Sequence, residues 1–225
     1  MRTFAVLPVK TFDRAKQRLS AGVGAPERVT LSAAMVGDVL EALHAVRGLD
    51  AVLVVTAEPR AAAAAREAGA QVLDDPAEAG HSEAALLGVH AAVRAGAERV
   101  LLVPGDCPAL DAAEAGALLE RDARQAAQAP RRVVIVSDRH GSGTNALLLT
   151  PPGAISPSFG PGSLARHAGM AAGAGAEVRV AGLRSLQLDV DTPGDLAALR
   201  DALGGLPGAA PRTRALLAEL ARAPA

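Results

Sequence analysis

The chain has 225 residues and a formal net charge of −1, and half of its residues are hydrophobic. That length suffices for one α/β domain with a full core, and the near-zero charge supplies no basic field for nucleic acid. Trp and Tyr are absent and only three Phe occur, which removes the stacking platforms of a single-strand binder. A single Cys excludes an internal disulfide, and no stretch approaches membrane-spanning length. We expect a soluble cytoplasmic protein with a small-molecule ligand and no nucleic-acid or membrane partner.

The first predicted strand covers residues 3–9 and leads into a basic loop. Four cations fall within nine positions of this loop: Lys10, Arg14, Lys16 and Arg18. Lys and Arg side chains just past a strand end can neutralise a leaving pyrophosphate, although the glycine pattern of a Walker loop is missing. A solvated surface would explain the same residues, so both interpretations remain open.

Helices and strands then alternate along the chain. The pattern predicts a helix over 26–46, a strand over 50–56, an alanine-rich helix over 60–68, a strand over 71–73 and a helix over 82–95. Asp75 follows the third strand, and Ser82 is the expected cap of the last of these helices. We expect His81 to be a loop residue rather than a ligand.

The run Val100–Val103 predicts a buried parallel strand that breaks at Pro104-Gly105 and presents Asp106. Ligands of open α/β sheets bind at the carboxyl ends of the strands. A carboxylate placed there is a candidate for metal or phosphate chemistry. The alternative is a helix cap, but Asp111 is better placed to cap the next helix, predicted over 111–125.

Two loops after this helix contain glycine and hydroxyl residues. The first joins predicted strands 132–136 and 146–149 and ends in Gly143-Thr144-Asn145, which allows close approach to an anion, although a hairpin turn also explains its glycines. The second runs over 158–163 and places Ser163 as the expected cap of a helix over 164–172. Arg166 and His167 fall on the first turns of that helix, where they can assist an anion site, but we favour a solvated Arg166 and a surface imidazole at His167.

The late part of the chain carries two further acids. Strands are predicted over 177–180 and 186–188, and the second is followed by Asp189 and Asp191, whose side chains point the same way in an extended chain. Together with Asp106 they offer three hard oxygen donors, which suit Mg²⁺ or Mn²⁺. We assign residues 1–203 to one domain and 204–225 to a tail with a helix over 215–223 that packs on the domain or on a partner subunit, as in a homodimer.

Several motifs, taken together, resemble the guanylyltransferases of coenzyme F420 biosynthesis, which act on phosphoenolpyruvate or 2-phospho-L-lactate. They stand in the family's order over residues 3–200, which is more specific than any one motif. The motifs are Leu7-Pro8-Val9-Lys10 with Ala15-Lys16 and Arg18-Leu19, Val103-Pro104-Gly105-Asp106 with Pro108-Ala109-Leu110, Gly143-Thr144-Asn145, Phe159-Gly160-Pro161-Gly162-Ser163 and Asp189-Val190-Asp191-Thr192-Pro193.

The resemblance implies a single-domain nucleotide-diphospho-sugar transferase fold, a Rossmann-like three-layer sandwich with a mixed, mostly parallel sheet. It also implies site residues: Mg²⁺ on Asp106, Asp189 and Asp191; the phosphorylated acid on Thr144, Gly160 and Ser163; the nucleotide on Pro8, Lys10, Lys16, Asp75 and Ser82; and catalysis by Lys16 and Asp106. The substrates would be GTP and a small phosphorylated carboxylic acid, and the product would pass to a downstream transferase of the F420 pathway. The chain departs from the family at Gly80-His81-Ser82, where members have Gly-Leu-Asn.

The residues themselves fit such a reaction. A phosphate monoester is largely dianionic at neutral pH and attacks the α-phosphorus of GTP without a strong general base, which agrees with the absence of a Ser-His pair. Other hypotheses are a nucleotidyltransferase for 3-phosphoglycerate, a molybdopterin or a sugar phosphate, and a non-catalytic nucleotide-binding subunit. The tight loop over 159–163 favours a small acid, and the three acids at predicted strand ends favour an enzyme.

Overall fold

The structure is a computed structural model that describes residues 1–20, 22–125 and 128–222. Seven strands form one sheet in the order β3-β2-β1-β4-β6-β5-β7. The strands are β1 (Thr3–Val9), β2 (Ala51–Thr56), β3 (Gln71–Asp74), β4 (Arg99–Leu102), β5 (Arg132–Ser137), β6 (Thr144–Thr150) and β7 (Glu177–Ala181). Only β6 is antiparallel to its neighbours, β4 and β5, so the sheet is mixed and mostly parallel, as predicted.

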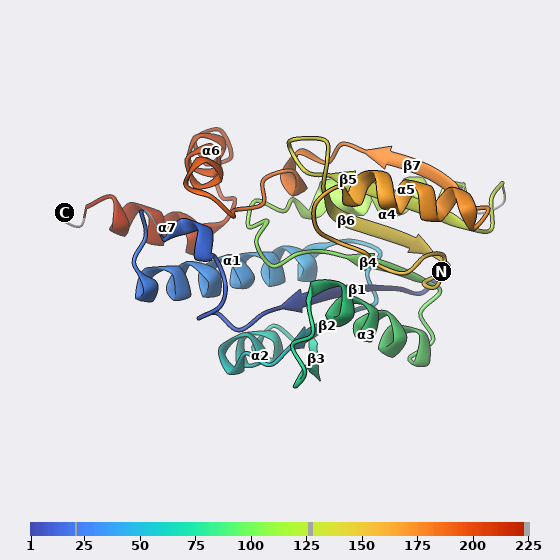
Figure 1. The fold of residues 1–225 in the computed structure, drawn as a ribbon, viewed down its shortest axis with the longest axis horizontal. Helices are drawn as coiled ribbons and strands as arrows, with labels where there is room; N and C mark the ends of the chain where they lie inside the picture. Colours follow the sequence, from blue (N-terminus) through green and yellow to red (C-terminus); the bar gives the residue numbers. More distant parts are fainter. Residues whose placement is uncertain (21, 126–127, 223–225) are drawn as a thin grey trace.

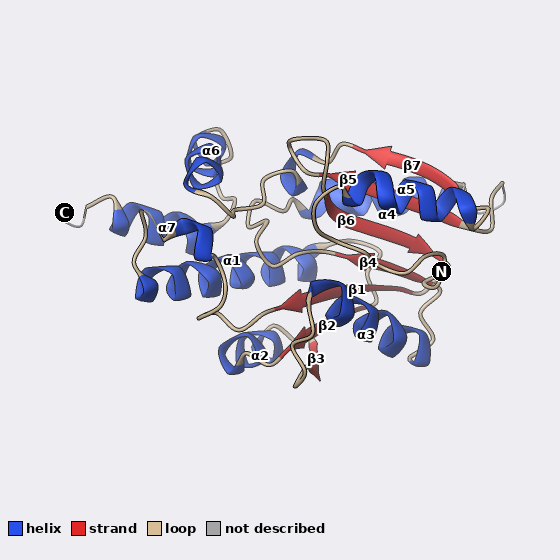
Figure 2. Cartoon of the chain, viewed as in Figure 1, coloured by secondary structure: helices blue, strands red, loops and turns tan. Residues whose placement is uncertain are grey.

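Helices cover both faces of this sheet (Figures 1 and 2). One face packs against α1 (Ala25–Ala45), α2 (Pro59–Glu67) and α4 (Ala112–Arg124). The other face packs against α3 (His81–Arg94) and α5 (Ser163–Gly173). The central strands β1 and β4 to β6 are buried along their whole length, which is why they read as continuous apolar runs. The predicted three-layer sandwich is confirmed.

The order of the strands determines where a ligand can bind. From β1 the chain crosses to β2 and β3 on one side, whereas β4 lies on the other side of β1. The loops that leave the carboxyl ends of β1 and β4 therefore diverge and open a crevice between them, as in other doubly wound sheets. Because β6 is antiparallel, its first residues lie at this same edge.

The C-terminal part lies beside α1 (Figure 1), and residues of both form a third buried apolar cluster. The C-terminal part contains α6 (Pro193–Gly204) and α7 (Pro211–Leu220). The buried Asp38 of α1 accepts the N–H groups of Arg212 and Thr213 at 3.0 and 2.8 Å, which satisfies free donors at the start of α7. The tail helix thus packs on its own domain. It begins four residues before the predicted position, and residue 223 of the prediction lies outside the described residues.

Three expectations about local structure are wrong. The predicted strand over 186–188 is absent, and the segment instead forms a short 3₁₀ helix, Arg184–Leu186, that buries Leu186 in the core. The helix caps at Ser82 and Ser163 are also wrong, because Gly80 and Gly162 occupy the cap positions. Gly162 is left-handed (φ 69°), a conformation that glycine adopts without the steric penalty a Cβ would bring. Asp111 caps α4 as predicted.

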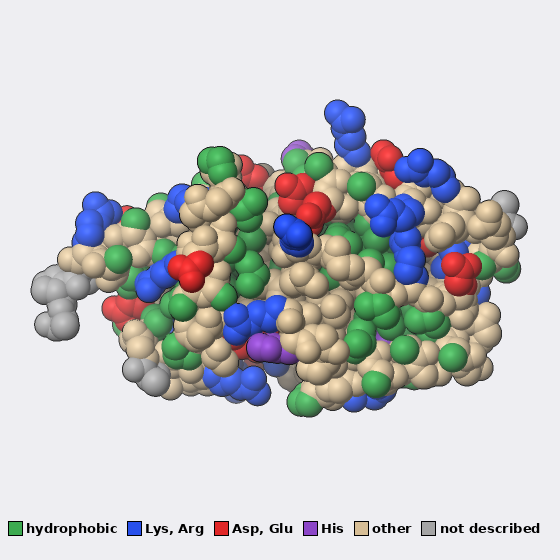
Figure 3. All heavy atoms as spheres, turned by 90° about the horizontal axis from the view of Figure 1, so that it is seen from above, with side chains coloured by type: hydrophobic (Ala, Val, Ile, Leu, Met, Phe, Trp, Pro, Cys, Tyr) green, Lys and Arg blue, Asp and Glu red, His purple; other side chains and the backbone are tan. Residues whose placement is uncertain are grey.

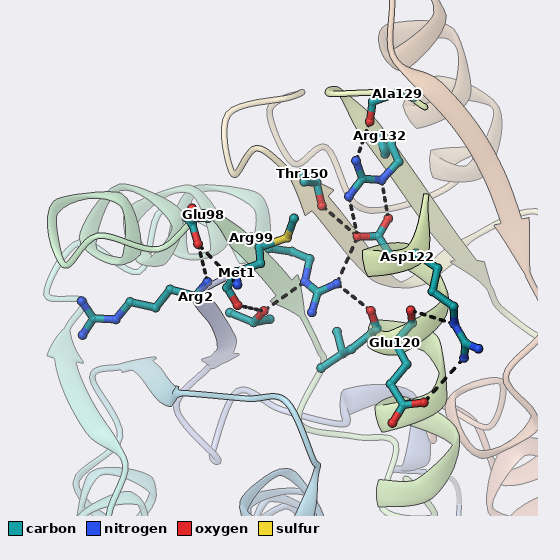
Figure 4. A network of polar contacts seen from close by, with 12 residues as sticks. Met1, Arg2, Glu98, Arg99, Glu120, Asp122, Ala129, Arg132 and Thr150 are labelled. Carbon is teal, nitrogen blue, oxygen red and sulfur yellow. Dashed lines mark hydrogen bonds and ion pairs between the residues drawn. The ribbon is translucent and has the colours of Figure 1, made fainter. Parts of the chain in front are cut away.

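A buried ion cluster fixes the edge of the sheet opposite the crevice (Figure 4). The carboxylate of Asp122 on α4 accepts Arg132 Nε and Nη2, each at 2.9 Å, and Arg99 Nη1 at 3.1 Å. Thr150 donates to it at 3.2 Å. Burial by itself raises the pKa of Asp122, but the hydrogen bonds from Arg132 and Arg99 outweigh it and hold the pKa below its usual value. The cluster ties α4 to β4, β5 and β6.

Candidate active site

The crevice holds a cavity of about 430 Å³ at the carboxyl ends of β1 and β4. Eight of the residues proposed from the sequence line it: Pro8, Lys10, Lys16, Asp106, Thr144, Gly160, Asp189 and Asp191. They come from five separate segments of the chain, which the fold brings to one edge. The fold therefore brings most of the predicted site residues to one cavity, while their chemical roles stay predictions.

Lys16 is the central cation of the cavity. Its ammonium donates to Asp106 Oδ2 at 2.5 Å and to Asp191 Oδ1 at 2.9 Å. Burial lowers the pKa of this lysine, but the charges of Asp106 and Asp191 outweigh burial and raise it above the usual range. The backbone of Lys16 is left-handed (φ 57°, ψ 31°), which is a costly conformation for a residue other than glycine. The two ion pairs of its side chain help to hold this conformation.

Asp106 has one compensated and one free oxygen. Burial raises the pKa of this carboxyl, but the Lys16 ammonium outweighs burial and lowers it, so the group is ionised. The second oxygen, Oδ1, is buried and has no hydrogen-bond partner. A buried carboxylate oxygen without a partner is costly, and a bound cation or water would offset that cost.

Asp189 lies beside Asp106, but within the described residues it has no lysine partner, and its partly buried charge is stabilised mainly by a hydrogen bond from Asn145. Burial raises the pKa of Asp189, and the nearby charge of Asp106 raises it further, against a hydrogen bond from Asn145. Asn145 Nδ2 donates to Asp189 Oδ1 at 3.1 Å and to the Leu186 carbonyl at 2.7 Å. The 3₁₀ turn and this amide, rather than an extended strand, thus place Asp189.

The three carboxylates fit a divalent cation chemically, since they are hard oxygen donors with one orphaned buried oxygen. They do not form a ready-made site: within the described residues, no group of three or more His, Cys, Asp or Glu side chains is close enough to hold a metal ion. Lys16 stands between Asp106 and Asp191. A cation that uses both carboxylates therefore requires this ammonium to move.

The opposite wall of the cavity is made by the start of β6 and the 158–162 loop. Thr144 and Gly160 line it, and Gly160 has φ 111°, which a residue with a Cβ rarely adopts. Ser163 does not line the cavity; its side chain is buried and its Oγ has no partner. Ser82 does not line it either, because its Oγ accepts the Phe159 N–H at 2.9 Å and so supports the loop.

A smaller cavity of about 210 Å³ adjoins the first along β1. Asp75 lies here, together with Glu78, and Pro8, Lys10 and His81 line both cavities. The Glu78 carboxylate accepts hydrogen bonds from the N–H and the hydroxyl of Thr11 at 3.2 and 2.9 Å. Of these acids, Asp75 is the one whose side chain makes no hydrogen bond or ion pair within the described residues.

Two histidines differ from what the sequence suggested. His81 is the first residue of α3 and lines both cavities, with its ring edge-on to Phe159 at 4.9 Å. Burial lowers its pKa. His167 is fully buried rather than on the surface. In the sequence, Gly80 was the signal for an unusual backbone conformation before His81, and its φ is 146° in the structure. No sequence pattern indicated the burial of His167, because its partner Thr144 is distant in the chain.

The charges on one face of the molecule are mixed. On the face shown in Figure 3, Lys and Arg side chains are interspersed with Asp and Glu and do not gather into a basic patch. Among the helices of the described residues, none combines the length and the apolar character needed to cross a membrane.

Solved structures define the class. A putative nucleotide-diphospho-sugar transferase from Desulfovibrio desulfuricans superposes with a TM-score of 0.72 and 18% identity, covering 97% of this chain and 95% of its own. A CMP:2-keto-3-deoxy-manno-octonic acid synthetase complexed with CTP superposes with a TM-score of 0.61 and 16% identity, covering 92% and 100%. The fold is thus that of the nucleotide-diphospho-sugar transferases.

The sequence defines the family. The model described as "Guanylyl transferase CofC like" matches residues 3–203. A phosphoenolpyruvate guanylyltransferase of Conexibacter woesei is 50% identical over 222 residues, 99% of this chain and 98% of that protein. A phosphoenolpyruvate guanylyltransferase of Sphaerobacter thermophilus is 41% identical over 199 residues, which are 88% of this chain and 93% of that protein. The chain belongs to the CofC-like guanylyltransferase family, which confirms the predicted resemblance and makes it a nucleotidyltransferase.

Proposed function

We propose that this enzyme joins GMP from GTP to phosphoenolpyruvate and releases pyrophosphate, as a step toward coenzyme F420, and that the product passes to a downstream transferase. The observation that carries the proposal is the convergence of Lys16, Asp106 and Asp191 at the edge of one cavity whose other wall holds Thr144 and Gly160. The names of the relatives supply the acceptor.

In the proposed reaction a phosphate oxygen of the acceptor attacks the α-phosphorus of GTP. The bond between that phosphorus and the oxygen bridging to the β-phosphate breaks, and pyrophosphate leaves with the electron pair. The acceptor oxygen is already ionised, so no side chain has to remove a proton. The protein's tasks are to hold two anions together and to stabilise the charge that builds on the leaving group.

The residues of the cavity suit these tasks. Asp106, Asp189 and Asp191 would hold Mg²⁺, or Mn²⁺ in its place, which supplies positive charge between the two anionic substrates. Lys16, released from the carboxylates, and Lys10, exposed at the mouth, are placed to contact the phosphates. Pro8 and Asp75 lie along the smaller cavity, which we assign to the nucleoside.

The acceptor subsite is the wall formed by Thr144 and Gly160. Its backbone turn at Gly160 and the Thr144 hydroxyl suit the carboxylate and phosphate of a three-carbon acid. Neither Ser82 nor Ser163 lines the cavity. The Ser82 hydroxyl accepts the Phe159 N–H, and the Ser163 N–H donates to the Gly160 carbonyl at 3.1 Å, so we propose that both residues act through the shape of the loop. The subsite has one aromatic ring, Phe159, and this agrees with a small acceptor rather than a pterin.

The test is pyrophosphate release with Mg²⁺, using GTP, CTP, ATP and UTP against phosphoenolpyruvate, 2-phospholactate and 3-phosphoglycerate, with products identified by mass spectrometry. We expect a signal that requires both GTP and phosphoenolpyruvate. A signal with GTP and another of the acids would keep the transfer and change the acceptor. Folded protein that is silent in every combination would contradict the proposal.

A further inference from the structure

His167 lies directly behind the acceptor wall. It is on α5, is 0% exposed, and contacts both elements of that wall. Its Nδ1 is 3.0 Å from the Thr144 hydroxyl oxygen at the start of β6, and its Nε2 is 2.8 Å from the Ser158 backbone nitrogen in the loop. One imidazole therefore bridges the two segments between which we place the acceptor.

The two contacts determine which ring nitrogen carries the proton. The Ser158 N–H can only donate, so Nε2 must be the unprotonated nitrogen that accepts. In a neutral imidazole the proton then resides on Nδ1, and Nδ1–H donates to the Thr144 oxygen. Burial and, secondarily, the Arg166 guanidinium lower the pKa of His167 to about 4, so the ring is neutral at physiological pH.

The direction of the Thr144 hydroxyl follows from this. Because its oxygen accepts from His167, its own proton is not used in that contact. Within residues 1–20, 22–125 and 128–222 the hydroxyl makes no other hydrogen bond, and Thr144 lines the cavity. We infer that His167 is a positioning residue that makes Thr144 a hydrogen-bond donor to the bound acceptor anion. This inference rests on the proposed function only for the identity of that anion.

The aromatic contacts strengthen the arrangement. The Phe159 ring is edge-on to His167 at 5.4 Å and to His81 at 4.9 Å, so it lies between the buried imidazole and the cavity. Arg166 donates to the Ser158 and Phe159 carbonyls at 2.8 and 3.3 Å. The loop is thus fixed from both sides, and the imidazole has little freedom to rotate.

Nuclear magnetic resonance tests the tautomer without reference to activity. In protein with ¹⁵N-labelled histidine, we expect the His167 signals at pH 7 to show a proton on Nδ1 and none on Nε2; the signals are assigned by their loss in His167→Gln. A ring protonated on Nε2, or on both nitrogens, would overturn the inference even if the enzyme proves active.

Kinetics test the consequence with two matched variants. The amide of Asn reaches the place of Nδ1, whereas the amide of Gln reaches that of Nε2. His167→Gln keeps the Ser158 contact and loses the donor to Thr144, so we expect the KM for the acceptor to rise about tenfold, as in Thr144→Val. The KM for GTP should stay within about twofold. His167→Asn keeps that donor and should recover most of the lost affinity.

The double variant separates positioning from a merely structural role. If His167 acts through the Thr144 hydroxyl, His167→Gln with Thr144→Val should raise the acceptor KM no more than either change alone. Three outcomes would refute the positioning role of His167. They are a double variant in which the two rises in acceptor KM multiply, an equal rise in the KM for GTP, and an unchanged acceptor KM in His167→Gln. His90→Gln, on an exposed part of α3, is the control. If the wild-type enzyme is inactive with every acceptor, that result counts against the proposed function. The resonance measurement then decides the inference about His167.

Discussion

Lys16 and Asp191 are separated by 175 positions in the chain, yet the lysine Nζ lies 2.9 Å from the aspartate Oδ1. The same ammonium contacts Asp106, so one cation compensates two of the three carboxylates that we assign to the metal. In this arrangement the lysine and the proposed divalent cation would compete for the same oxygens. The proposed reaction then requires nucleotide phosphates to draw the lysine away.

Replacing Lys16 by Met should therefore have two opposite effects. Turnover should fall at least about a hundredfold, because a cation near the leaving group is lost. Binding of Mn²⁺ without nucleotide, measured by electron paramagnetic resonance, should tighten about tenfold, because the competitor is gone. Arg94→Met, at an exposed end of α3, should change neither. Weaker Mn²⁺ binding in Lys16→Met would contradict the competition.

Asp106→Asn and Asp189→Asn should each keep the fold and lower kcat/KM on the order of a thousandfold, because the cation loses a charged ligand. Circular dichroism checks the fold and pyrophosphate release checks the activity. The matched control is Asp201→Asn on the exposed side of α6. Turnover near that of the wild type in either variant would remove that acid from the site.

Asn145→Leu tests how Asp189 is held. The amide donates to Asp189 and to the Leu186 carbonyl, so its loss leaves the carboxylate poorly placed. We expect the Mg²⁺ concentration for half-maximal rate to rise about tenfold. The KM for GTP at saturating Mg²⁺ should change less. An unchanged Mg²⁺ requirement would show that this amide has no part in placing the acid.

Asp122→Ala should destabilise the protein by about 3–5 kcal/mol, because it leaves Arg99 and Arg132 buried without their shared carboxylate. Urea denaturation measures this. Glu120→Ala on the same helix removes an exposed pair with Arg124 and should cost about 0–1 kcal/mol (Figure 4). Similar losses in the two variants would mean that the buried cluster contributes no more than a surface ion pair.

His167 makes stability depend on pH. Its folded pKa of about 4 lies below its value of about 6.5 in the unfolded chain, so the unfolded state binds more protons between these values. The contribution of the neutral, buried His167 to the free energy of unfolding is complete above about pH 6.5. It is lost as the pH falls toward 4, which lowers the free energy of unfolding by up to ~3 kcal/mol. In His167→Gln, denaturation curves should show a correspondingly flatter dependence over that window. Parallel pH profiles for the two proteins would refute this.

The strands of the site and the residues at their ends could be predicted because each depends on a local sequence pattern. The apolar run before Pro104-Gly105 identified β4, and a carboxylate at its end was placed correctly at the crevice. The same reasoning failed at Leu186, because one buried leucine satisfies a 3₁₀ turn as well as a strand. It failed at Ser82 and Ser163 because a glycine nearby takes the cap position in each case.

The contacts inside the site could not be predicted from sequence patterns. Lys16 meets Asp106 across 90 positions and His167 meets Thr144 across 23, and neither spacing is a period of any helix or strand. Such pairs depend on which strands are neighbours in the sheet. The family resemblance named Lys16 and Thr144, but only the structure shows what each of them touches.

The reversed direction of β6 has a consequence for how this enzyme can change. The side of the cavity that we assign to the nucleotide is built before residue 107, and the side that we assign to the acceptor is built after residue 138, except for the acids at 189 and 191. The two sides meet where Ser82 and His81 contact Phe159. In the proposed assignment, an exchange in the stretch 138–163 that keeps this contact can alter which acid is accepted while the residues assigned to GTP stay in place. Under that assignment, acceptor choice and nucleotide choice can evolve as separate traits.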